Sequence, residues 1–175
     1  MKAYVFRGSP ASGKGTITAE FIKKLPGKVA KLELDQFRWG FHLWNRNVSD
    51  VTEDEHAFAY QHFLSSLELY CKNGSYTLVV EGLFSWDTPG PHGNMRDILA
   101  IFKKYNVEHK IFLLYADYDT LWSRNQKRNY AVPEAEFRQL YDYVMQKKSE
   151  EEIQIEVLKQ SVSEIVDFLS LKVAE

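Results

Sequence analysis

The chain has 175 residues, 45% of them hydrophobic, and a formal net charge of −2 at pH 7. This length fits a single globular domain over residues 1–175, and the near-neutral charge excludes a general basic field for nucleic-acid binding. The one cysteine, Cys71, excludes an internal disulfide and favours a cytoplasmic location. We expect neither a signal peptide nor a membrane span, because the first residues lead straight into a loop motif and no run of about 18 apolar residues follows.

The first feature along the chain is a glycine-rich loop between an apolar run at 3–6 and a helical pattern. The loop reads Gly8-Ser9-Pro10-Ala11-Ser12-Gly13-Lys14-Gly15-Thr16. In this context the G-x-x-x-x-G-K pattern predicts a phosphate-binding loop, whose backbone N–H groups and following helix N-terminus bind a nucleoside triphosphate. Lys14 is then expected to bind the β- and γ-phosphates. The alternative is a glycine-rich turn with a solvated lysine.

One position of the loop departs from the pattern, because Gly15 stands where Ser or Thr usually follows the lysine. We therefore expect Thr16, Glu81 or water to contribute to Mg²⁺ binding in place of that hydroxyl. The nucleotide is expected to contact the following residues of the loop: Gly8, Ser9, Ala11, Ser12, Gly13, Lys14, Gly15 and Thr16.

Strand-like apolar runs and helical patterns alternate along the rest of the chain. Further strands are predicted at 29–34, 77–80, 109–115 and 153–157. The first helix should end at Pro26-Gly27, and Thr52 with Glu55 predicts a capping box for a long helix that Asn73-Gly74 closes. Later helices are expected to begin near Asn94, Asp117, Val132-Pro133 and Ser161.

Two stretches between these elements have no regular pattern. Residues 37–48 are aromatic and irregular, and 85–93 are rich in proline and glycine and are expected to form a mobile flap. The last helix is expected to bury one apolar face, made of Val162, Ile165, Val166 and Leu169.

The alternation predicts an α/β fold with a parallel sheet covered by helices on both faces. We expect a three-layer P-loop sandwich of about five strands in the order 2-3-1-4-5, with a helical lid at about 118–148. Ligands of such sheets bind beyond the carboxyl ends of the strands. The phosphate loop, Asp35 after the second strand and Glu81 after the third are therefore expected to converge there.

Asp35 is the candidate catalytic base, because a carboxylate beyond a strand can take the proton of an attacking hydroxyl or orient it. The alternative is an aspartate that caps the next turn. Arg38 lies three residues further on and shares a helical face with Asp35. It is expected to pair with Asp35, to bind a phosphate of the acceptor, or to be solvated.

Arg124 and Arg128 are spaced four residues apart, so that both would extend from one side of a helix. Two guanidinium groups on one face suit the β- and γ-phosphates and the charge that develops during transfer. The alternative is a basic, solvated helix face. Glu81 either holds Mg²⁺ through water or is a buried carboxylate bonded to the phosphate loop.

The aromatic stretch either stacks a ring of the acceptor or packs as core under a lid. Its aromatic and imidazole residues are Phe37, Trp39, Phe41, His42 and Trp44. The five histidines have no metal-ligand spacing with Cys71, so no zinc site is expected.

Several motifs in this order resemble the P-loop polynucleotide 5′-hydroxyl kinases. They are Gly-x-Pro-x-Ser-Gly-Lys at 8–14, Asp35-x-x-Arg38, Val107-Glu108-His109-Lys110, Arg124-Asn125-x-Lys127-Arg128 and Ala131-Val132-Pro133. The resemblance covers about 4–145 and implies that Asp35 activates a 5′-hydroxyl and that Arg38 holds the neighbouring phosphate. It also implies that Lys14 and the lid residue Arg128, with Arg124 beside it, bind the donor phosphates. Zeta-toxin-like and antibiotic-phosphorylating kinases share the loop and an aspartate after the second strand.

The sequence therefore favours a kinase that uses ATP and Mg²⁺ and transfers the γ-phosphate to a hydroxyl group. The first hypothesis is a 5′-hydroxyl of a nucleic acid or nucleotide as acceptor, with Asp35, Arg38 and Glu81 as the residues that bind it. The second is a small acceptor, such as a nucleoside, sugar or antibiotic. The third is a non-catalytic nucleotide-binding switch. No obligate protein partner is indicated.

Overall fold

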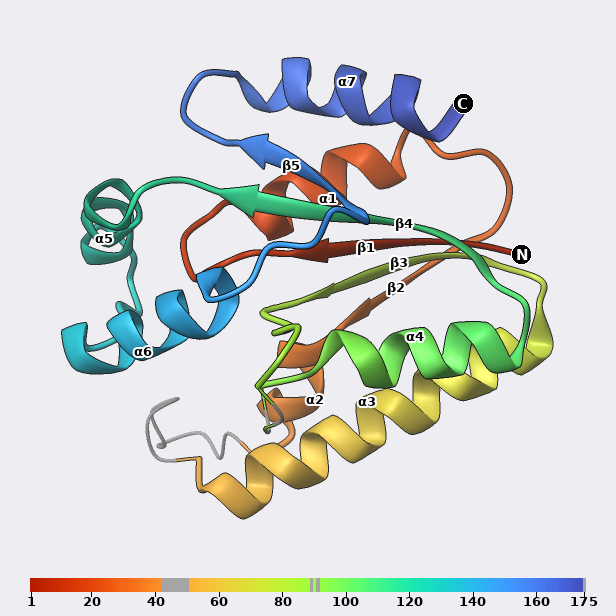
Figure 1. The fold of residues 1–175 in the computed structure, drawn as a ribbon, viewed down its shortest axis with the longest axis horizontal. Helices are drawn as coiled ribbons and strands as arrows, with labels where there is room; N and C mark the ends of the chain where they lie inside the picture. Colours follow the sequence, from red (N-terminus) through yellow and green to blue (C-terminus); the bar gives the residue numbers. More distant parts are fainter. Residues whose placement is uncertain (42–50, 89, 91, 175) are drawn as a thin grey trace.

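The computed structural model describes residues 1–41, 51–88, 90 and 92–174 and contains one five-stranded parallel sheet (Figure 1). The strand order is β2-β3-β1-β4-β5, which confirms the predicted topology. The strands are β1 (Lys2–Arg7), β2 (Val29–Glu33), β3 (Thr77–Gly82), β4 (Glu108–Tyr115) and β5 (Glu152–Glu156).

Helices cover both faces of this sheet. Figure 1 shows α1 and α7 on one side and α3 and α4 on the other. The helices are α1 (Lys14–Ile22), α2 (Leu34–Trp39), α3 (Glu53–Asn73), α4 (Met95–Lys104), α5 (Tyr118–Gln126), α6 (Glu134–Met145) and α7 (Val162–Ala174). The predictions of one domain over 1–175 and of a lid at about 118–148, which contains α5 and α6, stay predictions.

The alternation of side chains along β1 creates two cores, one on each face of the sheet. Ala3 and Val5 join the core under α3 and α4, whereas Tyr4 and Phe6 join the core under α1 and α7. This is the period-two pattern expected of a strand that is buried on both faces. The sheet is thereby fixed between two helical layers, and the loops at its carboxyl edge are held on a rigid base.

The predicted helix caps are found at both ends of α3 and at the start of α7. Thr52 and Glu55 form a reciprocal capping box, and Gly74 ends α3 in the left-handed conformation with φ 71°. At α7, the Glu164 N–H donates to the Ser161 hydroxyl, and the Glu164 carboxylate accepts from the Ser161 N–H. Val162 was expected in the core but is 37% exposed, because it lies in the first turn of α7.

Two boundaries near the start of the chain differ from the prediction. The α1 helix ends at Ile22, and the chain reaches Pro26 through turns in which the N–H of Leu25 donates to the Ile22 carbonyl. The residue before a proline is disfavoured in helical conformation, so the helix ends ahead of it.

The second difference is the short helix α2, which replaces the end of the predicted second strand and part of the irregular stretch. The strand β2 ends at Glu33, and Leu34 is fully buried at the start of α2. Leu34 and Phe37, three residues apart, pack into the core with α3. A helical turn is the conformation that points both side chains inward. Asp35 therefore lies in the first turn of a helix.

Within the described part of the chain, no helix is long and apolar enough to cross a membrane. Cys71 is a free, buried thiol on α3. The cytoplasmic location suggested by this single cysteine stays a prediction.

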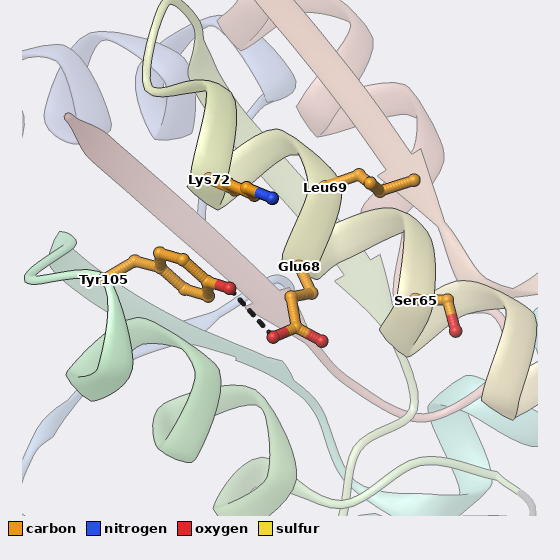
Figure 2. A pocket seen from close by; sticks show the side chains of 5 residues that line it. All are labelled: Ser65, Glu68, Leu69, Lys72 and Tyr105. Carbon is orange, nitrogen blue, oxygen red and sulfur yellow. Dashed lines mark hydrogen bonds between the residues drawn. The ribbon is translucent and has the colours of Figure 1, made fainter.

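A hollow of about 350 Å³ lies between α3 and α4 and is lined by Ser65, Glu68, Leu69, Lys72 and Tyr105 (Figure 2). The Tyr105 hydroxyl donates to the Glu68 carboxylate over 2.9 Å. The hollow lies near the ends of the two helices, which lead into β3 and β4. It is therefore at the amino ends of the strands, opposite the phosphate loop.

Candidate active site

The phosphate loop is a tight turn that needs glycine at two positions. A Cβ added at Gly8 would lie 2.5 Å from the carbonyl oxygen of Leu114, so no side chain fits between the loop and β4. Gly13 has φ 86° and Ala11 has φ 62°, both in the left-handed region that suits glycine best. Gly13 caps α1 with no side-chain hydrogen bond, and the first turn of α1 contains no acidic residue. This helix terminus is suited to an anion.

Lys14 folds back over the loop in this structure. Its Nζ donates to the carbonyl oxygens of Gly8 at 2.7 Å and Ser9 at 3.0 Å. Burial lowers the pKa of Lys14, and the charge of Arg128 lowers it as well, whereas the carboxylates of Glu81 and Asp35 act in the opposite direction. These four charged groups from four parts of the chain are therefore close enough to influence one another.

The remaining residues of the loop differ in their exposure to solvent. Ser9 and Ser12 are buried, with each residue 1% exposed. Gly15 and Thr16 are exposed in the first turn of α1.

Glu81 is a buried carboxylate that joins the sheet to α1. Its Oε2 accepts from the Thr18 hydroxyl at 2.7 Å and pairs with Nζ of Lys31 at 2.8 Å. Burial disfavours the charge of Lys31, but hydrogen bonds to Glu81 and Glu33 outweigh it, and the pKa of Lys31 is raised. Thr18 and Lys31 were missed in the sequence, because a hydroxyl in α1 and a lysine in β2 carry no recognisable motif.

The residues around Glu81 leave limited room for a directly bound metal. Among the described residues, no group of three or more His, Cys, Asp or Glu side chains could hold a metal ion. The Glu81 carboxylate already forms an ion pair with Lys31. Its Oε1 faces Gly15, where an added Cβ would be 3.7 Å away. One carboxylate beside a phosphate loop fits a hydrated Mg²⁺ that is held mainly by phosphate oxygens.

Asp35 and Arg38 form an ion pair within α2. Nη1 of Arg38 donates to Oδ1 of Asp35 over 2.6 Å. The Asp35 side chain is 55% exposed, whereas that of Arg38 is 7% exposed. Of the three possibilities left open by the sequence, the structure contains the pairing with Asp35. The carboxylate is accessible to an acceptor, and the guanidinium lies behind it.

His92 lies on the other side of Arg38. Its Nδ1 is 3.3 Å from Nη2 of Arg38, and its ring packs against those of His56 at 5.4 Å and Tyr143 at 5.7 Å. Burial lowers the pKa of His92 to about 4, and the neighbouring Arg38 and His56 lower it as well. This cluster was missed, because its members come from α2, α3, α6 and a loop and show no regular spacing in the sequence.

Arg124 and Arg128, the two arginines of the predicted lid, were expected to extend from one helix, but the structure places only Arg124 in a helix. Arg124 lies in α5 and donates to the carbonyl oxygen of Val157 at 3.2 Å, whereas α5 ends at Gln126 and Arg128 follows in an exposed turn. The cause is Asn125, which is fully buried. Its side chain exchanges two hydrogen bonds with the backbone of Val132, at 2.8 and 3.1 Å, and so turns the chain back.

The aromatic residues after Asp35 separate into packing residues and one exposed ring. Phe37 contacts Phe63 and Phe41 contacts Phe58 in edge-to-face pairs, with centroid distances of 5.8 and 5.9 Å. Trp39 is 67% exposed and lies one helical turn after Asp35. His42 and Trp44 lie outside the described residues. Among the described residues of this stretch, Trp39 is therefore the one with an exposed ring that could contact an acceptor.

A buried ion pair connects Arg7, the last residue of β1, to Glu152, the first residue of β5. The guanidinium of Arg7 donates to the Glu152 carboxylate at 2.6 and 3.0 Å, and both side chains are fully buried. Its other N–H groups donate to backbone carbonyl oxygens of Phe84, Val144 and Lys147. All five donors of the guanidinium are therefore used. Glu152 also accepts from the indole N–H of Trp86 at 3.1 Å.

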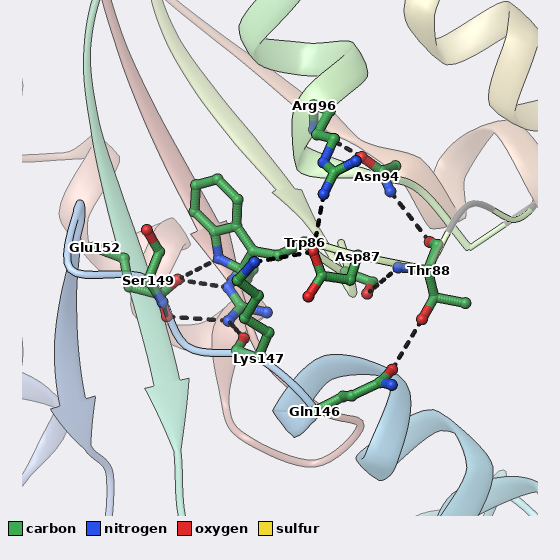
Figure 3. A network of polar contacts seen from close by, with 11 residues as sticks. Trp86, Asp87, Thr88, Asn94, Arg96, Gln146, Lys147, Ser149 and Glu152 are labelled. Atoms are coloured by element: carbon green, nitrogen blue, oxygen red, sulfur yellow. Dashed lines mark hydrogen bonds and ion pairs between the residues drawn. The ribbon is translucent and has the colours of Figure 1, made fainter.

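The same region fixes the described part of the loop predicted as a flap. The N–H of Ser85 donates to the Gly93 carbonyl, and the Tyr143 hydroxyl of α6 lies 2.8 Å from the same oxygen. Thr88 donates to the Gln146 side chain over 2.9 Å, as Figure 3 shows. The loop and the end of α6 are thus joined by several hydrogen bonds, and the flap motion stays a prediction.

A hollow of about 630 Å³ lies along this junction and is lined by Thr88, Gln139, Asp142, Tyr143, Met145 and Gln146.

The comparisons with known proteins agree with this architecture. A family model described as an AAA domain matches residues 4–146. A sugar kinase from Janibacter sp. has a TM-score of 0.66 at 13% identity, covering 99% of this chain and 95% of its own. The Mycobacterium tuberculosis APS kinase, solved with AMPPNP and APS, has a TM-score of 0.67 at 13% identity, covering 99% and 98%. A gluconokinase from Sinorhizobium meliloti has a TM-score of 0.63 at 13% identity, covering 99% and 91%. These similarities show a shared P-loop fold.

Proposed function

The chain belongs to this family of AAA domains, and from that premise we propose that it is an ATP-dependent kinase acting on a hydroxyl group of a small molecule. The observation that carries the proposal is the pairing of Asp35 with Arg38 within electrostatic reach of Lys14. A phosphate loop alone binds a nucleotide, whereas transfer also needs a group that activates the acceptor.

In the proposed reaction, the loop backbone and Lys14 bind the β- and γ-phosphates of ATP. The exposed carboxylate of Asp35 accepts the proton of the acceptor hydroxyl, whose oxygen forms a bond to the γ-phosphorus. The bond between the γ-phosphorus and the bridging oxygen breaks, and ADP leaves with that electron pair. Arg128 and Arg124 bind the phosphates and stabilise the charge that develops on them.

The proposed cofactor is Mg²⁺, which would neutralise charge on the β- and γ-phosphates when bound. Glu81 would hold its water shell from the sheet, because the carboxylate is fixed by Thr18 and Lys31. Thr16 remains a candidate ligand at the start of α1. Its hydroxyl belongs to an exposed residue, so it is accessible from solvent.

The surroundings of Asp35 favour a small acceptor. Arg38 is 6% exposed and uses both terminal nitrogens within the protein, so it is poorly placed to bind an external phosphate as well. The exposed ring of Trp39 suits a sugar or another ring instead. The proteins of similar fold include kinases named for a sugar, gluconate and APS, which is consistent with small acceptors.

A 5′-hydroxyl of a nucleic acid or nucleotide is the second candidate acceptor. The Asp35-x-x-Arg38 spacing and the Arg124-to-Arg128 segment favour it, because both motifs resemble those of the 5′-hydroxyl kinases. For that acceptor to bind, Arg38 would have to exchange its contact with His92 for one with a phosphate.

Transfer of labelled γ-phosphate to a panel of acceptors distinguishes the two candidates. The panel contains sugars, gluconate and APS, together with short DNA and RNA that carry a 5′-hydroxyl. We expect labelling of a small molecule and none of the oligonucleotides. Labelling of oligonucleotides alone would establish the second candidate. If ATP binds but none of these acceptors is labelled, the nucleotide-binding switch becomes the better account.

A further inference from the structure

His92 has no role in the reaction as described above, although it contacts Arg38, the ion-pair partner of the proposed base. It is half-buried in the loop between β3 and α4, and its Nδ1 lies 3.3 Å from Nη2 of Arg38. We propose that His92 is a positioning residue for phosphoryl transfer, which holds Arg38 and through it the carboxylate of Asp35. This inference rests on the proposed role of Asp35 as the base.

The chemistry of arginine determines the state of the His92 ring. A guanidinium has only donors, so Nδ1 of His92 must accept the hydrogen bond, and the ring proton must be on Nε2. A doubly protonated ring has no acceptor and would be repelled by Arg38. Burial holds the pKa of His92 at about 4, so the ring is neutral at physiological pH. The neutral state is the one that can hold Arg38.

Two contacts of Arg38 with described residues help to orient its guanidinium. Nη1 donates to Oδ1 of Asp35 at 2.6 Å, and Nη2 faces His92. Because the guanidinium is planar and rigid, fixing both terminal nitrogens fixes the direction of the bond to Asp35. Asp35 itself is more than half exposed. A displacement of about 1 Å in a reacting group can cost on the order of 10²-fold in rate, so this support matters.

His92 is in turn held by groups from several elements. Among the described residues, the titratable and charged groups that face it are Asp35 and Arg38 on α2, His56 on α3 and Tyr143 on α6. Burial raises the pKa of Tyr143 to about 12, so its hydroxyl stays protonated and can donate to the Gly93 carbonyl beside His92. A path of direct contacts therefore runs from α6 through the loop to Asp35.

Two substitutions separate positioning from simple packing. His92→Asn keeps an oxygen that can accept from Arg38, whereas His92→Phe keeps a ring against His56 and Tyr143 but removes the acceptor. His109→Phe is the matched control, because His109 lies on β4 and packs against Phe102. All three variants are made in the full chain.

The first readout is NMR of side-chain nitrogens, which does not depend on kinase activity. We expect the His92 ring to be protonated on Nε2, and the two Nη signals of Arg38 to be resolved in the wild type, His92→Asn and His109→Phe. In His92→Phe the Nη signals should merge, because the guanidinium rotates more freely. A proton on Nδ1 of His92, or unchanged Arg38 signals in His92→Phe, would overturn the proposal.

The second readout is steady-state transfer with the acceptor identified by the panel. In His92→Phe, kcat should fall by about tenfold or more while the Kd for ATP is unchanged, and His92→Asn should stay within about threefold of the wild type. Equal kcat values for His92→Phe and His109→Phe would refute the role in the reaction. If the wild type transfers no phosphate, the proposed function fails, and the NMR result still decides whether His92 holds Arg38.

Discussion

Glu152→Gln tests how strongly the buried ion pair stabilises the protein. The substitution keeps the shape of the side chain but removes the negative charge that faces Arg7. The Arg7 guanidinium, which is 0% exposed, would then remain charged with only neutral partners around it. Removing one partner of a buried pair typically costs about 3–5 kcal/mol, against a total stability of about 5–15 kcal/mol.

The assay is urea unfolding followed by tryptophan fluorescence, which includes Trp86, a direct partner of Glu152. The matched control is Glu156→Gln on the same strand, because Glu156 pairs with Lys159 at the surface and should cost no more than about 1 kcal/mol. The double variant Arg7→Met/Glu152→Leu should recover part of the loss, since it leaves no buried charge, although the Trp86 indole N–H and the carbonyl oxygens bonded to Arg7 lose their partners. Equal destabilisation by Glu152→Gln and Glu156→Gln would refute the reasoning.

Three further predictions concern the loop, the acceptor side and pH. Gly8→Ala should lower ATP affinity at least about tenfold, because the added Cβ would be 2.5 Å from a carbonyl oxygen. Gly15→Ser should keep ATP affinity within about threefold, because its Cβ would have an ordinary contact at 3.7 Å. Calorimetry measures the Kd for ATP of both variants. Trp39→Ala should raise KM for a ring-containing acceptor about threefold or more with Kd for ATP unchanged; an unaltered KM would exclude stacking. The pKa of His92 falls from 6.5 in the unfolded chain to about 4 in the fold, so the unfolded state binds more protons between these two values. The free energy of unfolding should therefore decrease as pH falls through that window, by up to about 3 kcal/mol. Urea titrations of the wild type and His92→Asn at pH 7 and 4.5 check this, since the variant should lose less stability.

The features predicted correctly from the sequence depend on short stretches of chain. The strand, glycine loop and helix at 2–22 form a local unit, and the two residues of each capping pair, which begin at Thr52 and Ser161, are three positions apart. The parallel sheet follows from the regular alternation of strands and helices, whereas the strand order was expected from the resemblance of the loop motif to P-loop kinases. Such signals are readable because the residues that determine each structure are neighbours in sequence.

The features that were missed depend on residues far apart in the chain. Arg7 and Glu152 are 145 positions apart, and Arg38 and His92 are 54 apart, so no pattern in the sequence joins either pair. The end of α5 was misplaced because the side chain of Asn125 bonds a backbone that returns seven residues later. In each case, tertiary packing determines which residue a side chain contacts, and the local sequence around that side chain does not indicate its partner.

The most direct test of the central claim is the effect of Asp35→Asn on binding and on transfer, measured side by side. The substitution preserves the size of the side chain and removes the carboxylate that we propose accepts the proton. We predict that the Kd for ATP, measured by calorimetry, stays within about twofold, whereas transfer of γ-phosphate falls by roughly 10²-fold or more. If Asp35→Asn transfers phosphate as fast as the wild type, Asp35 is not the base, and this account of the site is contradicted.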